Sequence, residues 1–118
     1  MKKVYYLSSC STCTRILKTL NIGDEFVKQD IKNDKITSVQ LDEMKRMAGS
    51  YESLFSRSAM KYKSLGLKDM TLEENDYKNY ILEEYTFLKR PVFIVNDQIF
   101  IGNSKKNIAA LELYLSSN

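Results

Sequence analysis

The sequence contains no histidine among its 118 residues, and this absence limits the chemistry that the protein can perform. Histidine is the side chain best suited to acid–base work at neutral pH. Any catalysis must therefore depend on thiolates, carboxylates or cationic side chains. The sequence also has only two cysteines. Two cysteines without a histidine cannot complete a four-ligand zinc site, so we expect no metal centre.

Long apolar runs are also missing, since none approaches the ~18 residues that a membrane-spanning helix needs. The first residues lead from Met1-Lys2-Lys3 into an expected strand and are too short for a signal peptide. A net charge of +3 is too mild to indicate nucleic acid, which requires a clustered basic face. We therefore expect one cytoplasmic domain, large enough for a single hydrophobic core, with neither a membrane nor nucleic acid as direct partner.

Both cysteines, Cys10 and Cys13, stand between an expected strand at 3–7 and an expected amphipathic helix at 14–20. A thiol in the first turn of a helix faces unpaired backbone N–H groups and the positive end of the helix dipole. Both favour the thiolate, which attacks disulfides and other electrophiles. The second thiol, one turn away, can release a mixed disulfide. We predict that Cys10 is the nucleophile, because it is nearer the helix end, and that Cys13 is the resolving thiol.

Other interpretations of the cysteine pair remain open. A structural disulfide between positions three apart would close a very small loop and stabilise little. Two free cysteines that pack as small hydrophobic side chains are the main alternative. In a cytoplasmic protein, however, a C-x-x-C between a strand and a helix is typical of thioredoxin-like redox motifs.

The remaining pattern predicts an α/β, thioredoxin-like fold over residues 1–118. Strand, helix and strand within ~30 residues indicate a βαβ unit with parallel strands. A hairpin and a last helix, capped by Ser104, follow at the end of the chain. The order β-α-β, helical insertion, β-β-α predicts a mixed four-stranded sheet flanked by helices. The predicted strands occupy residues 3–7, 25–31, 92–95 and 99–101, and the insertion occupies about 33–88.

Two helices of the insertion have recognisable ends. Thr37 or Ser38 can cap the first, and Gly49 ends it. Thr71 with Glu74 three residues on has the signature of a capping box that opens the last.

The only proline, Pro91, precedes the first strand of the hairpin. Proline cannot donate into a sheet ladder, so the start of a strand accommodates it. A cis Arg90–Pro91 bond would let this turn approach the cysteines, and a trans proline that simply starts the strand fits the sequence as well.

These segments resemble the arsenate reductase (ArsC)/Spx family of glutaredoxin-like proteins. The resemblance rests on four segments that occur in order at the right spacing: Cys10 after the first strand, Phe55–Ser58 followed by Tyr62–Leu67, Leu88–Ile94, and Ile99–Ile108. In arsenate reductases of this type the cysteine attacks arsenate and arginines hold the oxyanion. The resemblance puts these roles on Cys10, Arg57 and Arg90, and it implies a cis Arg90–Pro91 bond.

The resemblance also implies a substrate-binding set and a source of electrons. A guanidinium fork suits a tetrahedral oxyanion, and a nearby cation favours a thiolate. Each arginine alone would fit a surface cation or an ion-pair partner equally well. No bound cofactor is implied, and glutathione with glutaredoxin, or thioredoxin, would act as external reductant. The implied substrate-binding residues are Ser11, Thr12, Arg57, Arg90 and Pro91.

The chain departs from the family's arsenate reductases near the nucleophile. Those enzymes carry a histidine in the turn before it, where this chain has Tyr6–Ser9. A third anion-binding arginine is absent, since Gly102 falls near its place, with Lys105 and Lys106 a turn further on.

Cys13 replaces the usual non-cysteine residue and gives the C-x-x-C a resemblance to the Spx branch. Members of that branch sense thiol oxidation and bind the α-subunit of RNA polymerase. Gly49 matches a glycine that the branch uses at this contact, although a helix C-cap explains Gly49 as well. Two functions therefore stay open: a thiol-dependent reductase of small oxyanions or disulfides, and a redox-switched module that binds a partner protein.

Overall fold

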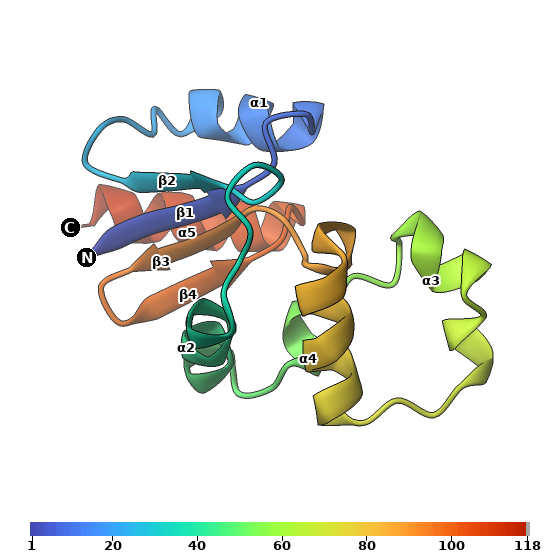
Figure 1. The fold of residues 1–118 in the computed structure, drawn as a ribbon. Helices are drawn as coiled ribbons and strands as arrows, with labels where there is room; N and C mark the ends of the chain where they lie inside the picture. The colour runs from blue at the N-terminus through green and yellow to red at the C-terminus, as the bar shows by residue number, and fades with distance from the viewer. Residues whose placement is uncertain (118) are drawn as a thin grey trace. The chain divides into compact units, whose positions relative to one another are not determined.

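The computed structural model describes residues 1–117 and divides the chain into two compact units (Figure 1). The first contains Met1–Asp34 and the chain from Arg90 onward, and the second contains Lys35–Lys89. Both boundaries lie within two residues of the ends of the expected insertion. That the two units form one domain stays a prediction.

The first unit is built on a four-stranded sheet of order β2-β1-β3-β4. β1 runs parallel to β2, with Tyr6 opposite Asp30, and antiparallel to β3. β3 and β4 form the hairpin. The predicted mixed four-stranded sheet is therefore confirmed. The strands are β1 (Lys2–Tyr6), β2 (Val27–Asp30), β3 (Val92–Val95) and β4 (Gln98–Ile101).

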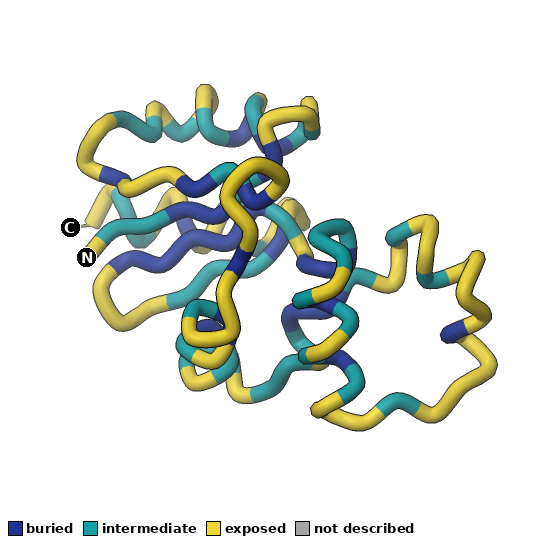
Figure 2. Tube along the Cα trace, in the orientation of Figure 1, coloured by how far each residue is buried: buried dark blue, intermediate teal, exposed yellow. Residues whose placement is uncertain are grey.

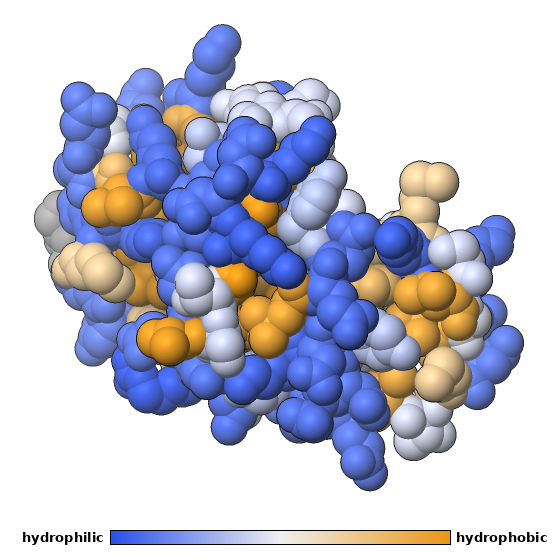
Figure 3. All heavy atoms as spheres, viewed as in Figure 1, coloured by the Kyte–Doolittle hydropathy of each residue, from blue (hydrophilic) through white to orange (hydrophobic). Residues whose placement is uncertain are grey.

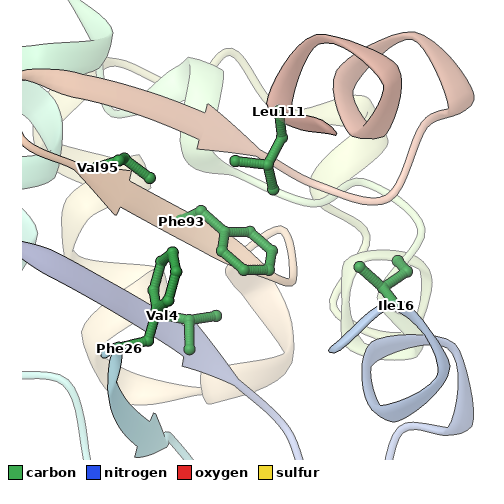
Figure 4. Close-up of a cluster of buried hydrophobic side chains, with 6 residues drawn as sticks. All are labelled: Val4, Ile16, Phe26, Phe93, Val95 and Leu111. Atoms are coloured by element: carbon green, nitrogen blue, oxygen red, sulfur yellow. The ribbon is translucent and has the colours of Figure 1, made fainter. Parts of the chain in front are cut away.

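Helices α1 (Ser11–Thr19) and α5 (Lys105–Ser116) cover the same face of this sheet. Ile16 of α1 and Leu111 of α5 reach the same buried cluster, to which the strands and the segment before β2 contribute Val4, Phe26, Phe93 and Val95 (Figure 4). The rings of Phe26 and Phe93 meet edge to face with centroids 5.9 Å apart. This packing fixes α1 on the sheet, and it therefore fixes where the cysteines at the start of α1 lie relative to β1.

The second unit is helical, with buried stretches between exposed ones along its trace (Figure 2), and an aromatic cluster surrounds Phe55. Phe55 is fully buried, stacks on Phe87 at 5.0 Å and meets Tyr77 edge-on at 5.0 Å. Backbone pairing of Phe55 with Leu88 ties the two ends of this cluster together. The elements are α2 (Ser38–Ala48), α3 (Met60–Ser64), α4 (Glu74–Glu83) and the 3₁₀ helices η1 (Glu52–Leu54), η2 (Leu67–Asp69) and η3 (Tyr85–Phe87).

Three predicted helix ends are confirmed. Thr37 caps α2, since its side chain accepts from the N–H of Gln40 while the Gln40 side chain accepts from the N–H of Thr37. Gly49 ends α2 in the left-handed region at φ 97°, which glycine adopts without steric cost. Ser104 caps α5 by accepting from the N–H of Asn107 at 3.1 Å.

The predicted start of α4 is wrong. Glu73 is its N-cap, and the Asp76 carboxylate accepts from the N–H of Glu73 at 2.8 Å. The Glu74 carboxylate instead accepts from the backbone N–H groups of Tyr51 and Glu52, at 2.7 and 3.0 Å. Because Glu74 serves a contact 22 or 23 residues away, it cannot reach back to Thr71.

The segment of α3 and η2 exposes apolar side chains, which Figure 3 shows gathered over this part of the second unit. Met60, Leu65 and Met70 are exposed there, whereas Leu67 is buried. None of the helices within residues 1–117 has the length and apolar character needed to cross a bilayer.

Candidate functional site

The Cys10 sulfur lies at the start of α1, where the chain leaves β1 through a tight turn. The N–H of Cys10 donates to the Leu7 carbonyl at 3.0 Å, and Cys10 then has the extended backbone of a helix N-cap, with φ −93° and ψ 110°. At an N-cap, Ser, Thr, Asp or Asn ordinarily accepts from the backbone N–H two or three residues on. Cys10 occupies this position, although its sulfur accepts no capping hydrogen bond of ordinary geometry.

The surroundings of Cys10 favour its thiolate. Partial burial raises its pKa, but several interactions together outweigh this effect. The backbone N–H of Cys13, the Cys13 side chain, the backbone N–H of Thr12 and the positive charge of Arg90 all stabilise the anion. The pKa of Cys10 therefore lies below its ordinary value.

Cys13 has the opposite character. Its side chain is fully buried on the inner face of α1. Burial is the main reason that its pKa rises to about 11, and a hydrogen bond and the negative charge from Cys10 add to the rise, against smaller lowering effects from the Leu7 backbone and Arg90. The two cysteines are not joined by a disulfide. The pair is therefore one half-exposed thiol with a lowered pKa beside one buried thiol with a raised pKa.

Arg90 and Pro91 enter the same unit from the start of β3. The Arg90–Pro91 peptide is cis, as the resemblance implied. Pro91 is buried, and its carbonyl accepts from the N–H of Gly102 at 2.8 Å. The charge of Arg90 lowers the pKa of both Cys10 and Cys13. An arginine is thus close enough to the sulfurs to stabilise negative charge on them.

Arg57 lies in the second unit, where acidic and aromatic side chains engage it. Its Nη2 donates to Glu52 at 2.8 Å and to the hydroxyl of Tyr77 at 3.0 Å. Its guanidinium also lies over the Tyr77 ring, 5.6 Å from the centroid. An anion that bound Arg57 would have to compete with the Glu52 carboxylate, so its role in substrate binding stays a prediction.

The other predicted binding residues contribute through their backbone or lie on the surface. Thr12 acts on Cys10 through its backbone N–H, and Ser11 is exposed. Gly102, near the place of the missing arginine, has no side chain to offer and adopts φ 90°. Lys105 and Lys106 are exposed on the first turn of α5.

Asp30 is a residue of this region that sequence reasoning missed. It ends β2 opposite Tyr6 of β1, and its carboxylate accepts a hydrogen bond from the hydroxyl of Ser8, two residues before Cys10. The available signal was topological, because the carboxyl ends of neighbouring parallel strands meet at one sheet edge, where ligand sites of α/β proteins gather. Polar residues after both strands therefore mark this edge.

Chemically, this arrangement suits attack by sulfur on an electrophile. Cys10 supplies the nucleophile, Cys13 supplies a second thiol within reach of it, and Arg90 supplies a positive charge. A thiolate can attack a disulfide sulfur, and an adjacent guanidinium can stabilise an oxyanion.

Comparison with known structures supports the fold. An arsenate reductase from Vibrio cholerae is 20% identical, with a TM-score of 0.71 over 94% of this chain and 95% of that one. An ArsC-family-related protein from Bacteroides fragilis is 22% identical, with a TM-score of 0.73 over 93% and 96% of the two chains. A Staphylococcus aureus protein is 24% identical, with a TM-score of 0.74 over 93% and 97%. At these identities the similarity establishes the thioredoxin-like fold alone.

Sequence comparison goes further than structure comparison here. A search of curated proteins found no match. The sequence model of the ArsC family, in contrast, matches residues 5–111, a span that includes both cysteines, both arginines and Pro91. This chain therefore belongs to the ArsC family.

Proposed function

We propose that this protein is a thiol-dependent reductase of the arsenate reductase type, in which Cys10 is the nucleophile. The observation that carries the proposal is the position of Cys10 at the N-cap of α1, where N–H groups, the Cys13 thiol and Arg90 hold its pKa low. A purely structural cysteine has no need of this environment, because buried structural thiols are inert. Membership of the ArsC family supports the same class of reaction.

With a disulfide substrate, the Cys10 thiolate attacks one sulfur, the substrate S–S bond breaks, and the departing thiolate takes a proton from solvent. Cys13 then loses its proton and attacks the Cys10 sulfur, so that a Cys10–Cys13 bond forms and the second substrate thiol leaves. The substrate gains two electrons and the pair loses two. External glutathione, glutaredoxin or thioredoxin would return them.

The environment of Cys13 sets the order of these two reaction steps. The hydrogen bond and the negative charge of Cys10 contribute to the raised pKa of Cys13. Both contributions disappear once the Cys10 sulfur is in a mixed disulfide. The resolving thiol therefore ionises more readily after the first step than before it.

With arsenate, Cys10 attacks arsenic, an S–As bond forms and one oxygen leaves as water. A second thiol, from Cys13 or glutathione, then attacks the Cys10 sulfur. The S–As bond breaks with its electron pair left on arsenic, which becomes arsenite, while two thiols become one disulfide. Arg90 would stabilise the oxyanion through charge-assisted hydrogen bonds.

The test is NADPH oxidation in coupled assays with glutathione and glutaredoxin, and separately with thioredoxin. Each assay offers arsenate in one arm and bis(2-hydroxyethyl) disulfide in the other. We expect turnover in at least one arm, its loss in Cys10→Ser, and a decrease in Arg90→Gln. Arg15→Gln, which changes an exposed arginine of α1, is the matched control. Turnover that persists in Cys10→Ser would refute the proposal.

A redox-switched binding module is the second candidate, and the buried Cys13 beside Cys10 favours it equally. Absence of turnover, together with ready formation of a Cys10–Cys13 disulfide, would support this function. A pull-down with the α-subunit of RNA polymerase, reduced against oxidised, would then test the partner that the Spx resemblance implies. Gly49 serves as the C-cap of α2, so Gly49→Ala would require a helix stability control in that experiment.

A further inference from the structure

Asp30 gathers hydrogen bonds from two separate segments of the first unit. Its carboxylate accepts from the Ser8 hydroxyl and, at 3.4 Å, from the Ser8 N–H. It also accepts from the N–H of Lys32 at 3.3 Å and from the side chain of Asn33 at 3.0 Å. One carboxylate thus joins the turn that precedes Cys10 to the turn that follows β2.

Ser8 connects this carboxylate to the nucleophile within a very short stretch of chain. Ser8 and Ser9 lie inside the turn that the Leu7 carbonyl and the N–H of Cys10 close at 3.0 Å. On the other strand, the N–H of Ile31 donates to the Tyr6 carbonyl at 2.9 Å and continues the pairing of β1 with β2 past Asp30. The turn is therefore held at its beginning by the sheet and at Ser8 by Asp30.

We propose that Asp30 is a positioning residue that acts through Ser8 to hold the Cys10 sulfur at the N-terminus of α1. This inference rests on the proposed function only for the importance of Cys10. The N–H groups of Thr12 and Cys13 stabilise a sulfur only when the turn places it in front of them, because such interactions weaken steeply with poor alignment. Without the contact, exposed Ser8 and Ser9 would be held only by the backbone hydrogen bond between Cys10 and Leu7, and the turn would gain freedom.

If Asp30 acts by positioning, its removal should shift the pKa of Cys10 in one direction, and if it acts only by its charge, in the opposite direction. A carboxylate near a thiolate opposes ionisation, so removing only its charge should lower the pKa of Cys10. Loss of positioning should raise that pKa towards the free-thiol value of about 8.5. Two titratable side chains act on Cys10, namely Cys13 and Arg90. Both are unchanged in the variants below.

The experiment measures the pH dependence of Cys10 carboxamidomethylation by iodoacetamide, with labelled peptides read by mass spectrometry. We expect Ser8→Ala and Asp30→Ala to shift the midpoint upward. In the double variant, Ser8→Ala should add little to the effect of Asp30→Ala, because the Ser8 hydroxyl has already lost its acceptor there. Asp30→Asn, which keeps an acceptor oxygen for the Ser8 hydroxyl, should raise the midpoint less than Asp30→Ala does. Asp24→Ala, which removes an exposed carboxylate elsewhere in the same unit, is the control.

A midpoint that falls or does not move in Ser8→Ala and Asp30→Ala would overturn the inference. Thermal unfolding of each variant checks that it is folded. If Asp30→Ala is not folded, Ser8→Ala decides, since it removes one exposed hydroxyl. Alkylation requires no substrate, so a protein without reductase turnover could still show the shift, and the two proposals can fail separately.

Discussion

Iodoacetamide added to the reduced wild-type protein at pH 7 should label Cys10 and leave Cys13 unlabelled. The rise of the Cys13 pKa from 9.0 to about 11 lowers its thiolate fraction at neutral pH about 100-fold. Cys13 also has no exposed surface from which to attack the reagent. Cys10 is half-buried and its pKa is lowered, so both ionisation and access favour it.

The two cysteines fall in one tryptic peptide, Val4–Arg15, in which fragment ions assign the label to either position. As the pH of labelling is raised towards 11, labelling of Cys13 should increase about tenfold per unit. In urea both cysteines should react at similar rates, which provides the control. Equal labelling of the folded protein at pH 7, or preference for Cys13, would refute the assignment of nucleophile and resolving thiol.

Three further predictions concern stability. Phe55→Ala, which removes the ring at the centre of the aromatic cluster, should lower the free energy of unfolding in urea by about 3–5 kcal/mol, and a loss below about 1 kcal/mol would contradict this packing. Thr37→Ala, which removes the cap of α2, should cost about 1 kcal/mol by the same measurement, whereas Thr37→Ser should cost less. The lowered pKa of Cys10 should make wild-type stability rise with pH up to about 8.5. The stabilisation that comes from the Cys10 thiolate is lost as the pH falls through the folded-state pKa of Cys10. Cys10→Ala should therefore lack this rise in stability. The raised pKa of Cys13 acts in the opposite direction, between about 8.5 and 11.

Local sequence signals predicted the elements well where each signal and its partner lie close together. Thr37, Gly49 and Ser104 act on groups within four residues of themselves, and their roles were correct. Glu74 satisfies the backbone of Tyr51 and Glu52 instead of its own helix. No local pattern encodes that contact, so the predicted start of α4 was wrong.

The same distinction applies to the site. Cys10 and Cys13 could be predicted because the strand, the turn and the helix that position them are continuous in sequence. Ser8 and Asp30 are 22 residues apart, and only the parallel pairing of β1 with β2 brings them together. The engagement of Arg57 by Glu52 and Tyr77 also depends on tertiary packing, which residue type and motif do not reveal.

The position of Cys10 at the N-cap of α1 has a consequence for the direction of electron flow. In the reduced protein the surroundings of Cys10 at the start of the helix stabilise its thiolate form, whereas a sulfur in a disulfide carries no negative charge to place there. Formation of the disulfide therefore removes a favourable interaction that only the reduced form possesses. Selective stabilisation of the reduced form raises the reduction potential of a pair relative to a pair that lacks it. The start of α1 would thus make a Cys10–Cys13 disulfide easier to reduce, which in the proposed reductase favours regeneration of the reduced pair by an external thiol.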